Sequence, residues 1–261
     1  MSSWRSLREE AARWHGAGRR ADLWWRDDDA VDGGPALDRL LALHRHTATP
    51  LSLAVVPAHA TQALADRLGD EPGIDLLQHG YAHLNHAAAG EKKAELGFHR
   101  PAMVVLGELG TGWLAMERLF GGGRTLAVMV PPWNRIAPAL IPTLPEIGFS
   151  GLSTFGPRRR AHPVRGLLAI NTHVDLIDWQ GGRGFVGEAA ALDALVAALA
   201  HARTVSDEPI GLLSHHLAMD AGAWDFLRSL WENAPTLPGI RIRPSRELFA
   251  PKHVAGGEKL G

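Results

Sequence analysis

Short apolar segments and helical segments alternate along almost the whole chain. The segments predicted as strands are residues 23–26, 51–56, 74–77, 126–130, 149–152, 167–171, 210–214 and 240–243. Apolar residues at helical spacing predict helices at residues 3–16, 35–45, 61–68, 91–119, 137–147, 188–202 and 221–231, with an interruption of the fourth at Pro101 left open. Such alternation is typical of parallel strands connected by crossover helices. Because the sequence shows no internal repeat and no linker between domains, it favours one closed or nearly closed α/β barrel.

The length of the chain agrees with a single barrel. Barrels commonly reach about 200–250 residues as one unit, and this chain has 261. We predict a barrel domain over residues 21–250, preceded by an N-terminal helical extension over residues 1–20. We expect a flexible tail over residues 251–261.

Composition excludes several classes of function. The chain has no Cys, which excludes disulfides, thiolate metal sites, iron–sulfur clusters and a cysteine nucleophile. A net charge of −1 argues against binding to nucleic acid or to an anionic membrane surface. No apolar run reaches the length of about 18 residues that a transmembrane helix needs, and the charged first 20 residues lack a signal core. We therefore expect a cytoplasmic protein, and the sequence does not indicate its oligomeric state.

Polar side chains gather directly after the predicted strands. In parallel α/β barrels the carboxyl ends of the strands share one face, which holds the active site. Residues that are distant in sequence are therefore expected to converge there. The groups concerned are Asp27-Asp28-Asp29, His79 with His83, Trp133-Asn134-Arg135, His173 with Asp175 and Asp178, and His215-His216.

Two of these groups indicate a metal site. His79 and His83 are four residues apart, so both rings can face the same way on a helical turn or a tight loop. Two neutral imidazoles and one carboxylate suit zinc and similar metals, and leave positions open for water and substrate. With 14 His in the chain, such a pair also arises by chance. The run Asp27-Asp28-Asp29 supplies carboxylates for a metal ligand and for a general base, although a solvated acidic turn is the alternative.

The order of these motifs resembles that of the NodB-homology polysaccharide deacetylases, the fourth family of carbohydrate esterases. The resemblance covers about residues 22–216 and rests on Asp-Asp, His-x-x-x-His, a Pro-aromatic turn, Asp-Trp and Leu-x-His, in that order. It implies a distorted (β/α)7-type barrel that binds one divalent metal, usually zinc, through Asp-His-His. It also implies hydrolysis of N-acetyl groups of amino sugars. The family's Thr-Phe before the two Asp is absent, as is its Pro after His83, which places this chain in a divergent branch.

The resemblance assigns roles to individual residues. It makes Asp28 the base and Asp29, His79 and His83 the metal ligands, although Asp27-Asp28 is an alternative register for the acidic pair. The third motif retains Pro132-Trp133.

The position of the third motif's Arg is taken by Val130, so the partner of the base must come from elsewhere, with Arg26 and Arg135 as candidates.

The same resemblance makes His215 the general acid and Asp178, which precedes Trp179, the carboxylate that charges it. Trp133, Trp179, Arg135 and His173 are predicted to contact substrate. His86 is interpreted as a non-ligand, and His216 stands where the family often has Asp.

The function predicted from the sequence is therefore metal-dependent removal of an acyl group, typically acetyl, from an N-acylated sugar or polysaccharide. Two alternatives stay open. One is hydrolysis of a small non-sugar amide or cyclic ureide by the same centre. The other is an inactive relative that binds carbohydrate, which the missing Arg at Val130 favours slightly.

Overall fold

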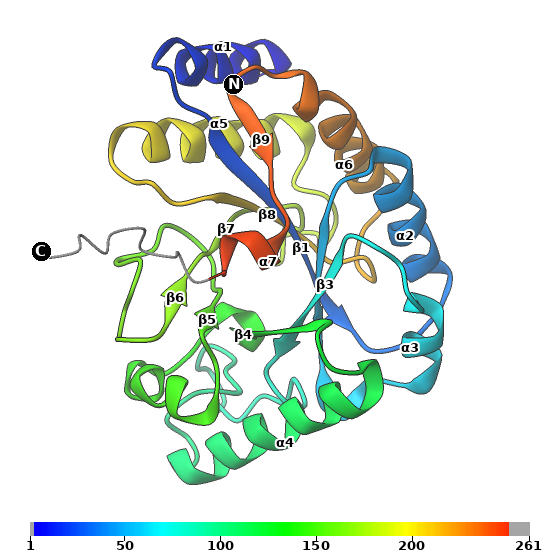
Figure 1. The fold of residues 1–261 in the computed structure, drawn as a ribbon, viewed down its shortest axis with the longest axis vertical. Coiled ribbons are helices and arrows are strands. Elements are labelled where there is room, and N and C mark those ends of the chain that lie inside the picture. Colours follow the sequence, from blue (N-terminus) through cyan, green and yellow to red (C-terminus); the bar gives the residue numbers. More distant parts are fainter. Residues whose placement is uncertain (1–2, 251–261) are drawn as a thin grey trace, which may run out of the picture.

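The computed structural model describes residues 3–250, and its framework is a sheet of nine strands in which every pairing is parallel. The order of the strands along the sheet is β6-β5-β4-β3-β2-β1-β8-β7, and β9 pairs with β1 (Figure 1). The strands are β1 (Ala21–Ala30), β2 (Leu51–Val55), β3 (Ile74–His79), β4 (Thr125–Val130), β5 (Gly151–Leu152), β6 (Leu168–Ala169), β7 (Thr172–Asp175), β8 (Ile210–Ser214) and β9 (Ile240–Ile242).

A single segment, residues 168–175, joins the two edges of this sheet. Its first half, β6, pairs with β5, and its second half, β7, pairs with β8. Between them, the amide of Ile170 donates to the carbonyl of Leu152 at 3.1 Å. The sheet therefore curls into the distorted α/β barrel that was predicted. The strand expected at residues 167–171 was placed too early, because pairing with β8 continues to Asp175.

Helices cover the outside of the sheet, except α7 (Ser245–Leu248), which lies near the centre of the view in Figure 1. The outer helices are α1 (Trp4–Gly16), α2 (Pro35–Thr47), α3 (Gln62–Leu68), α4 (Ala102–Phe120), α5 (Glu188–Thr204) and α6 (Ala221–Asn233). Short 3-10 turns are η1 (Pro57–His59), η2 (Pro132–Asn134), η3 (Pro138–Thr143), η4 (Pro145–Ile147) and η5 (Ala234–Thr236). Within residues 3–250, no helix is both long and apolar enough to cross a membrane.

Two predicted helices differ from the observed ones, and proline accounts for both differences. The helix expected from residue 91 begins only at Ala102, directly after Pro101. The helix expected over residues 137–147 is instead the two 3-10 turns η3 and η4. A proline lacks the amide donor of a helical hydrogen bond, and Pro138, Pro142 and Pro145 fall in this stretch.

The N-terminal helix α1 packs into the helical layer. Leu7, Ala11 and Trp14 are buried on one face of it. The indole of Trp14 donates to the carbonyl of Leu199 in α5 at 3.1 Å, and the ring of Trp4 lies 5.9 Å from that of Phe226. The predicted tail at residues 251–261 lies outside the described residues.

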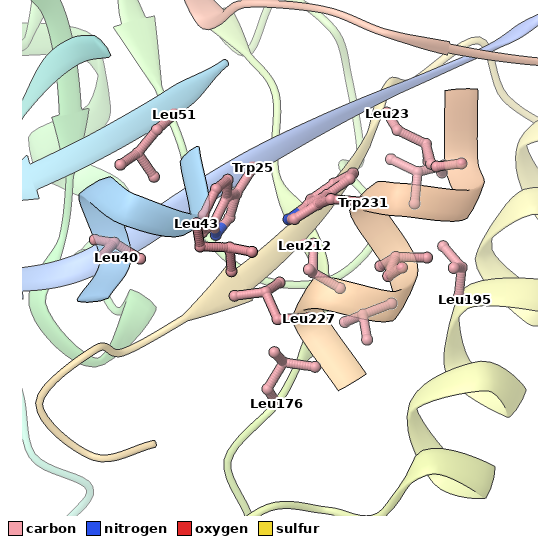
Figure 2. Packing of buried hydrophobic residues seen from close by; sticks show 14 of the residues in the cluster. Leu23, Trp25, Leu40, Leu43, Leu51, Leu176, Leu195, Leu212, Leu227 and Trp231 are labelled. Carbon is pink, nitrogen blue, oxygen red and sulfur yellow. The ribbon is translucent and has the colours of Figure 1, made fainter. Parts of the chain in front are cut away.

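Strand β1 carries the centre of the largest apolar cluster. Figure 2 shows Trp25 of β1 beside Trp231 of α6, and their ring centres are 5.7 Å apart. The indole of Trp25 donates to Ser214 of β8 at 2.8 Å, so this large side chain is buried without an unpaired donor. Truncating a buried Trp typically costs about 3–5 kcal/mol. The first half of β1 is thus held rigidly, and its second half carries the polar residues.

Candidate metal centre

Asp29, His79 and His83 converge at the carboxyl ends of β1 and β3. Each offers one ligand atom, and these atoms all lie within 4.8 Å of one another. Asp29 Oδ1 is 3.1 Å from Nε2 of His79 and 3.3 Å from Nε2 of His83. The structure therefore brings together the three residues predicted as ligands, with Asp29 rather than Asp28 facing the imidazoles. His86 is not part of this cluster.

Backbone strain is concentrated around these residues. Six described residues other than glycine have a positive φ, and four of them, Asp29, His83, Trp133 and Asn134, lie at this end of the barrel. A left-handed conformation of such residues costs on the order of 1–3 kcal/mol each. Strain of this kind persists where the surrounding structure enforces it, which is typical of functional sites.

The hydrogen bonding of His79 defines which of its nitrogens faces the cluster as an acceptor. Its Nδ1 lies 2.9 Å from the carbonyl oxygen of Val130, an acceptor, so Nδ1 carries a proton. In the neutral ring, Nε2 then carries a lone pair, and this lone pair points at the carboxylate of Asp29. Two acceptors 3.1 Å apart require a positive species between them, either a proton or a metal cation.

The charges of the cluster also favour a positive species beside Asp29. Burial raises the pKa of Asp29, but its hydrogen bond with His79 and the charges of three His outweigh burial and hold the pKa well below its usual range. Burial lowers the pKa of His79, but the charges of Asp28 and Asp29 raise it above the ordinary value. The pKa of His83 is lowered by burial and by the charge of His79, which favours a neutral ligand ring. Two imidazoles and one carboxylate fit a divalent transition metal and leave coordination positions open.

Asp28 has a different partner, the guanidinium of Arg26. Nε of Arg26 donates to Oδ1 of Asp28 at 2.8 Å and Nη2 donates to Oδ2 at 3.0 Å, with both side chains almost wholly buried. Arg26 also donates to Ser153 Oγ and to Asn134 Oδ1, each at 2.7 Å. Of the two candidate partners for Asp28, the structure therefore pairs Arg26 with it. Arg135, the other candidate, is exposed and donates to the carbonyl of Lys93 at 2.8 Å.

Asp27 points to the opposite side, into a closed network with β8. Its Oδ1 is 2.5 Å from Nδ1 of His216, and its Oδ2 accepts from the Ser214 hydroxyl at 2.5 Å and from the His216 amide at 3.1 Å. Burial lowers the pKa of His216, but the charge of Asp27 raises it above its ordinary value overall. Asp27 and Asp28 therefore each have donor or cationic partners from the chain, whereas Asp29 faces the two imidazoles.

His215 lies beside Asp175 and Trp179, whereas the sequence predicted Asp178 as its carboxylate partner. His215 Nδ1 is 3.8 Å from Oδ1 of Asp175, whose Oδ2 accepts from the indole of Trp179 at 2.9 Å. Asp178 instead accepts backbone amides of its own turn, including that of Gly181 at 2.9 Å. The carboxyl end of β7 extends further than expected, so Asp175 reaches the position assigned to Asp178. Burial raises the pKa of Asp175, although the charge of His215 opposes the rise.

The residues predicted to contact substrate divide into two groups. The ring of Trp133 lies 4.4 Å from that of His83, and the ring of Trp179 lies 4.8 Å from that of His215, so both indoles border the centre. His173 lies elsewhere, with Nε2 3.4 Å from Oε2 of Glu208 and Nδ1 3.3 Å from the amide of Gly211. Arg135 is likewise directed away, towards Lys93.

Glu95 is a part of the site that sequence reasoning missed. Its buried carboxylate accepts the backbone amides of Tyr81 at 3.1 Å and Ala82 at 2.7 Å, in the loop between His79 and His83. Gly80 makes room for it, since a Cβ at Gly80 would lie 2.1 Å from Oε2 of Glu95. Glu95 was placed within a predicted helix, where it could not bridge to this loop. The glycine between the histidines was the sole signal in the sequence.

The fold is that of family 4 carbohydrate esterases. A Mycobacterium smegmatis protein provisionally named a polysaccharide deacetylase is 16% identical, with a TM-score of 0.66 over 89% of this chain and 90% of that one. A family 4 carbohydrate esterase from Streptomyces lividans, solved with acetate, is 15% identical, with a TM-score of 0.55 over 84% and 90%. A Clostridium thermocellum family 4 acetyl xylan esterase, solved with a cobalt ion, is 14% identical, with a TM-score of 0.51 over 87% and 90%.

Neither a family model nor a curated protein matches the sequence. The resemblance seen in the sequence motifs is therefore confirmed in the fold, and the low identities agree with a divergent branch.

Proposed function

We propose that this protein is a metal-dependent deacetylase that removes an acyl group, typically acetyl, from an N-acylated sugar or polysaccharide. The observation that carries the proposal is the convergence of Asp29, His79 and His83. The Asp28–Arg26 pair is built from the same strand as Asp29, and His215 follows the neighbouring strand β8. The structural neighbours named above, which include esterases and deacetylases, support this reading.

The proposed ligands are Asp29, His79 and His83, and zinc is the metal we expect. Such a metal would polarise the acyl carbonyl and lower the pKa of a water molecule towards about 7. Asp28 is the proposed base that takes the proton of the attacking water. Arg26 positions Asp28, because a bidentate pair fixes the plane of the carboxylate.

His215 is the proposed acid that protonates the departing amine nitrogen as the C–N bond breaks. In place of Asp178, we assign Asp175 as the carboxylate that orients and charges it. Trp133 and Trp179 are the proposed walls for the acyl methyl group or a sugar face.

The first test is the metal content of the purified protein, measured by elemental mass spectrometry in the wild type and in His79→Ala. The proposal expects about one transition metal per chain in the wild type and loss of it in the variant. A wild type that stays free of metal after zinc is supplied would exclude the proposed mechanism.

The second test is a panel of acetylated amino sugars beside small linear and cyclic amides. Hydrolysis of the sugars identifies the proposed class, and hydrolysis of small amides alone identifies the alternative substrate class. The reading as an inactive carbohydrate-binding relative was favoured by the missing Arg at Val130. Because Arg26 supplies the guanidinium partner of Asp28, that reason no longer applies.

A further inference from the structure

Within residues 3–250, the helix that packs most extensively against α5 is α1. On one flank α1 packs against it, with Trp14 donating to the carbonyl of Leu199. On the other flank the chain between β5 and β6, residues 153–167, forms a loop without a helix. Among the described residues, this face of α5 is therefore bordered by loop residues such as Phe155 and Pro157 rather than by a helix.

That face lines an apolar groove. Ala190, Ala194, Ala197 and His201 follow the spacing that places side chains on one face of a helix. One cavity of about 310 Å³ is bounded by residues that include Ala194, Ala197, Ala198, Pro157 and Ile210. A second cavity of about 330 Å³ shares Ala194 and His173 with the first and continues past Phe155, Ile177, Val186 and Trp179.

The groove also has a fixed polar floor. His173 and Glu208 line it with side chains that are 5% and 2% exposed. Glu208 accepts the amides of Asn171 at 2.9 Å and Arg158 at 2.8 Å, so the floor is held by the backbone on both sides. A largely apolar hollow with a few fixed polar groups is the usual form of a small-molecule site.

The far end of the groove is cationic. A third cavity, of about 610 Å³, shares His201 and Ser206 with the first. It is lined by five arginines, namely Arg19, Arg158, Arg159, Arg160 and Arg203. Arg158 is paired with Asp207 and Arg203 with Glu10, but Arg159 and Arg160 make no ion pair with any described residue. This positive end is a local feature, since the chain as a whole has a net charge of −1.

We propose that this groove binds a single-chain amphiphile with an anionic head group. The apolar chain would lie along α5 between Ala190 and His201, a span of about 16 Å at the helical rise per residue. The head group, a phosphate or sulfate, would be bound by Arg159 and Arg160. Guanidinium groups bind such anions through charge-assisted hydrogen bonds. The second cavity is also lined by Asp175 and Trp179, so the groove adjoins the candidate metal centre, but binding of the head group by Arg159 and Arg160 does not require the hydrolase activity proposed above.

Dodecyl phosphate, kept below its micelle concentration, is a suitable probe for isothermal titration calorimetry. We expect one saturable site per chain in the wild type. Inorganic phosphate and dodecyl maltoside should each bind at least about tenfold more weakly, because each lacks one half of the recognised chemistry.

Two variants and a matched control locate the site. Ala197→Trp places an indole in the groove and should abolish binding. Arg159→Glu with Arg160→Glu should weaken binding by at least about tenfold while the groove stays open. Ala189→Trp introduces the same indole on α5 at an exposed position that does not line the groove, and should bind like the wild type.

The proposal is overturned by either of two results. One is the absence of saturable binding in a wild type whose thermal unfolding is cooperative. The other is equal binding by Ala197→Trp and the wild type. If the wild type shows no saturable binding, sedimentation of the wild type and of Ala197→Trp tests whether the chain forms a dimer. A wild-type dimer that Ala197→Trp dissociates would show that a second copy of the chain occupies the groove.

Discussion

Asp27 and Asp29 are two residues apart on β1, yet their surroundings differ in kind. Asp27 has a hydrogen-bond donor for each oxygen, from Ser214 and from the amide and ring of His216. Asp29 faces a ring nitrogen of His79 and one of His83. Nε2 of His79 carries a lone pair while that ring is neutral. A carboxylate whose partners are all supplied by the chain stabilises the fold. A carboxylate that faces further acceptors leaves room for an external cation, as proposed for Asp29.

The backbone shows the same difference. Asp29 has a φ of 74°, in the left-handed region, and Asp27 is not among the residues with positive φ. Strand β1 thus keeps a regular backbone through the closed network and distorts it at the centre. If metal binding depends on Asp29 and stability depends on Asp27, substitutions at the two positions should have different effects.

The largest effect is expected for Asp29→Ala. We predict loss of the metal and a fall in turnover of at least about 1000-fold, because the carboxylate ligand is removed. Metal content and the rate on whichever substrate is identified measure both effects. Retention of a full complement of metal would remove the distinction between Asp29 and Asp27.

Asp28→Asn should separate chemistry from metal binding. We predict that the metal is retained while turnover falls by about 100–10,000-fold, the usual contribution of a positioned base. Metal content should be measured in the same preparation as the rate. Loss of metal in this variant would show that Asp28, and not Asp29, is the ligand.

Asp27→Asn should affect stability and leave the metal in place. The variant leaves the buried ring of His216 without its carboxylate, and breaking such a pair typically costs about 3–5 kcal/mol. Urea unfolding followed by circular dichroism gives the change in the free energy of unfolding. An unchanged midpoint together with lost metal would reverse the assignment of the two carboxylates.

Glu95→Gln should weaken the metal centre from outside it. Gln has an amide group in place of one of the two oxygens that hold the loop between His79 and His83, so we predict about 10–100-fold weaker metal affinity. Competition with a chelator measures this affinity. Glu91→Gln is the control, because Glu91 is exposed and pairs with His99. Equal affinities in both variants would restrict Glu95 to a structural role.

The smallest effect concerns pH. The pKa of His216 is raised in the folded state, so its pair with Asp27 contributes fully below the unfolded value of 6.5 and is lost as pH rises through the folded value. We predict that the stability of the metal-loaded protein declines as the pH rises above 6.5. Urea unfolding from pH 6 to pH 9 measures the decline, which Asp27→Asn should reduce. A decline of the same size in that variant would assign it to other groups.

The sequence predicted the elements that depend on local pattern. The parallel strands, the barrel and the gathering of polar residues at strand ends follow from apolar periodicity and are seen in the structure. The identity of the carboxylate beside His215 did not follow, because it depends on where β7 ends, and the choice moved from Asp178 to Asp175. A short apolar segment does not indicate at which residue the strand ends.

Long-range partners were predictable only as alternatives. Arg26 was one of two candidates for the partner of Asp28, and only the fold separates it from Arg135. His173 was expected near substrate because it follows a strand, but an irregularity in the pairing of β7 lies at this residue and its ring contacts Glu208. Glu95 reaches its loop only because the expected helix starts later, after Pro101.

The closure of the barrel by residues 168–175 has a consequence for local unfolding. Strands β5 and β6 are two residues long each, so they form the thinnest seam of the sheet. Regions with few hydrogen bonds and few buried contacts open first in native-state hydrogen exchange. Arg26 reaches this seam by donating to Ser153, directly after β5. The guanidinium that positions Asp28 therefore also holds the edge at which amide exchange is expected to begin.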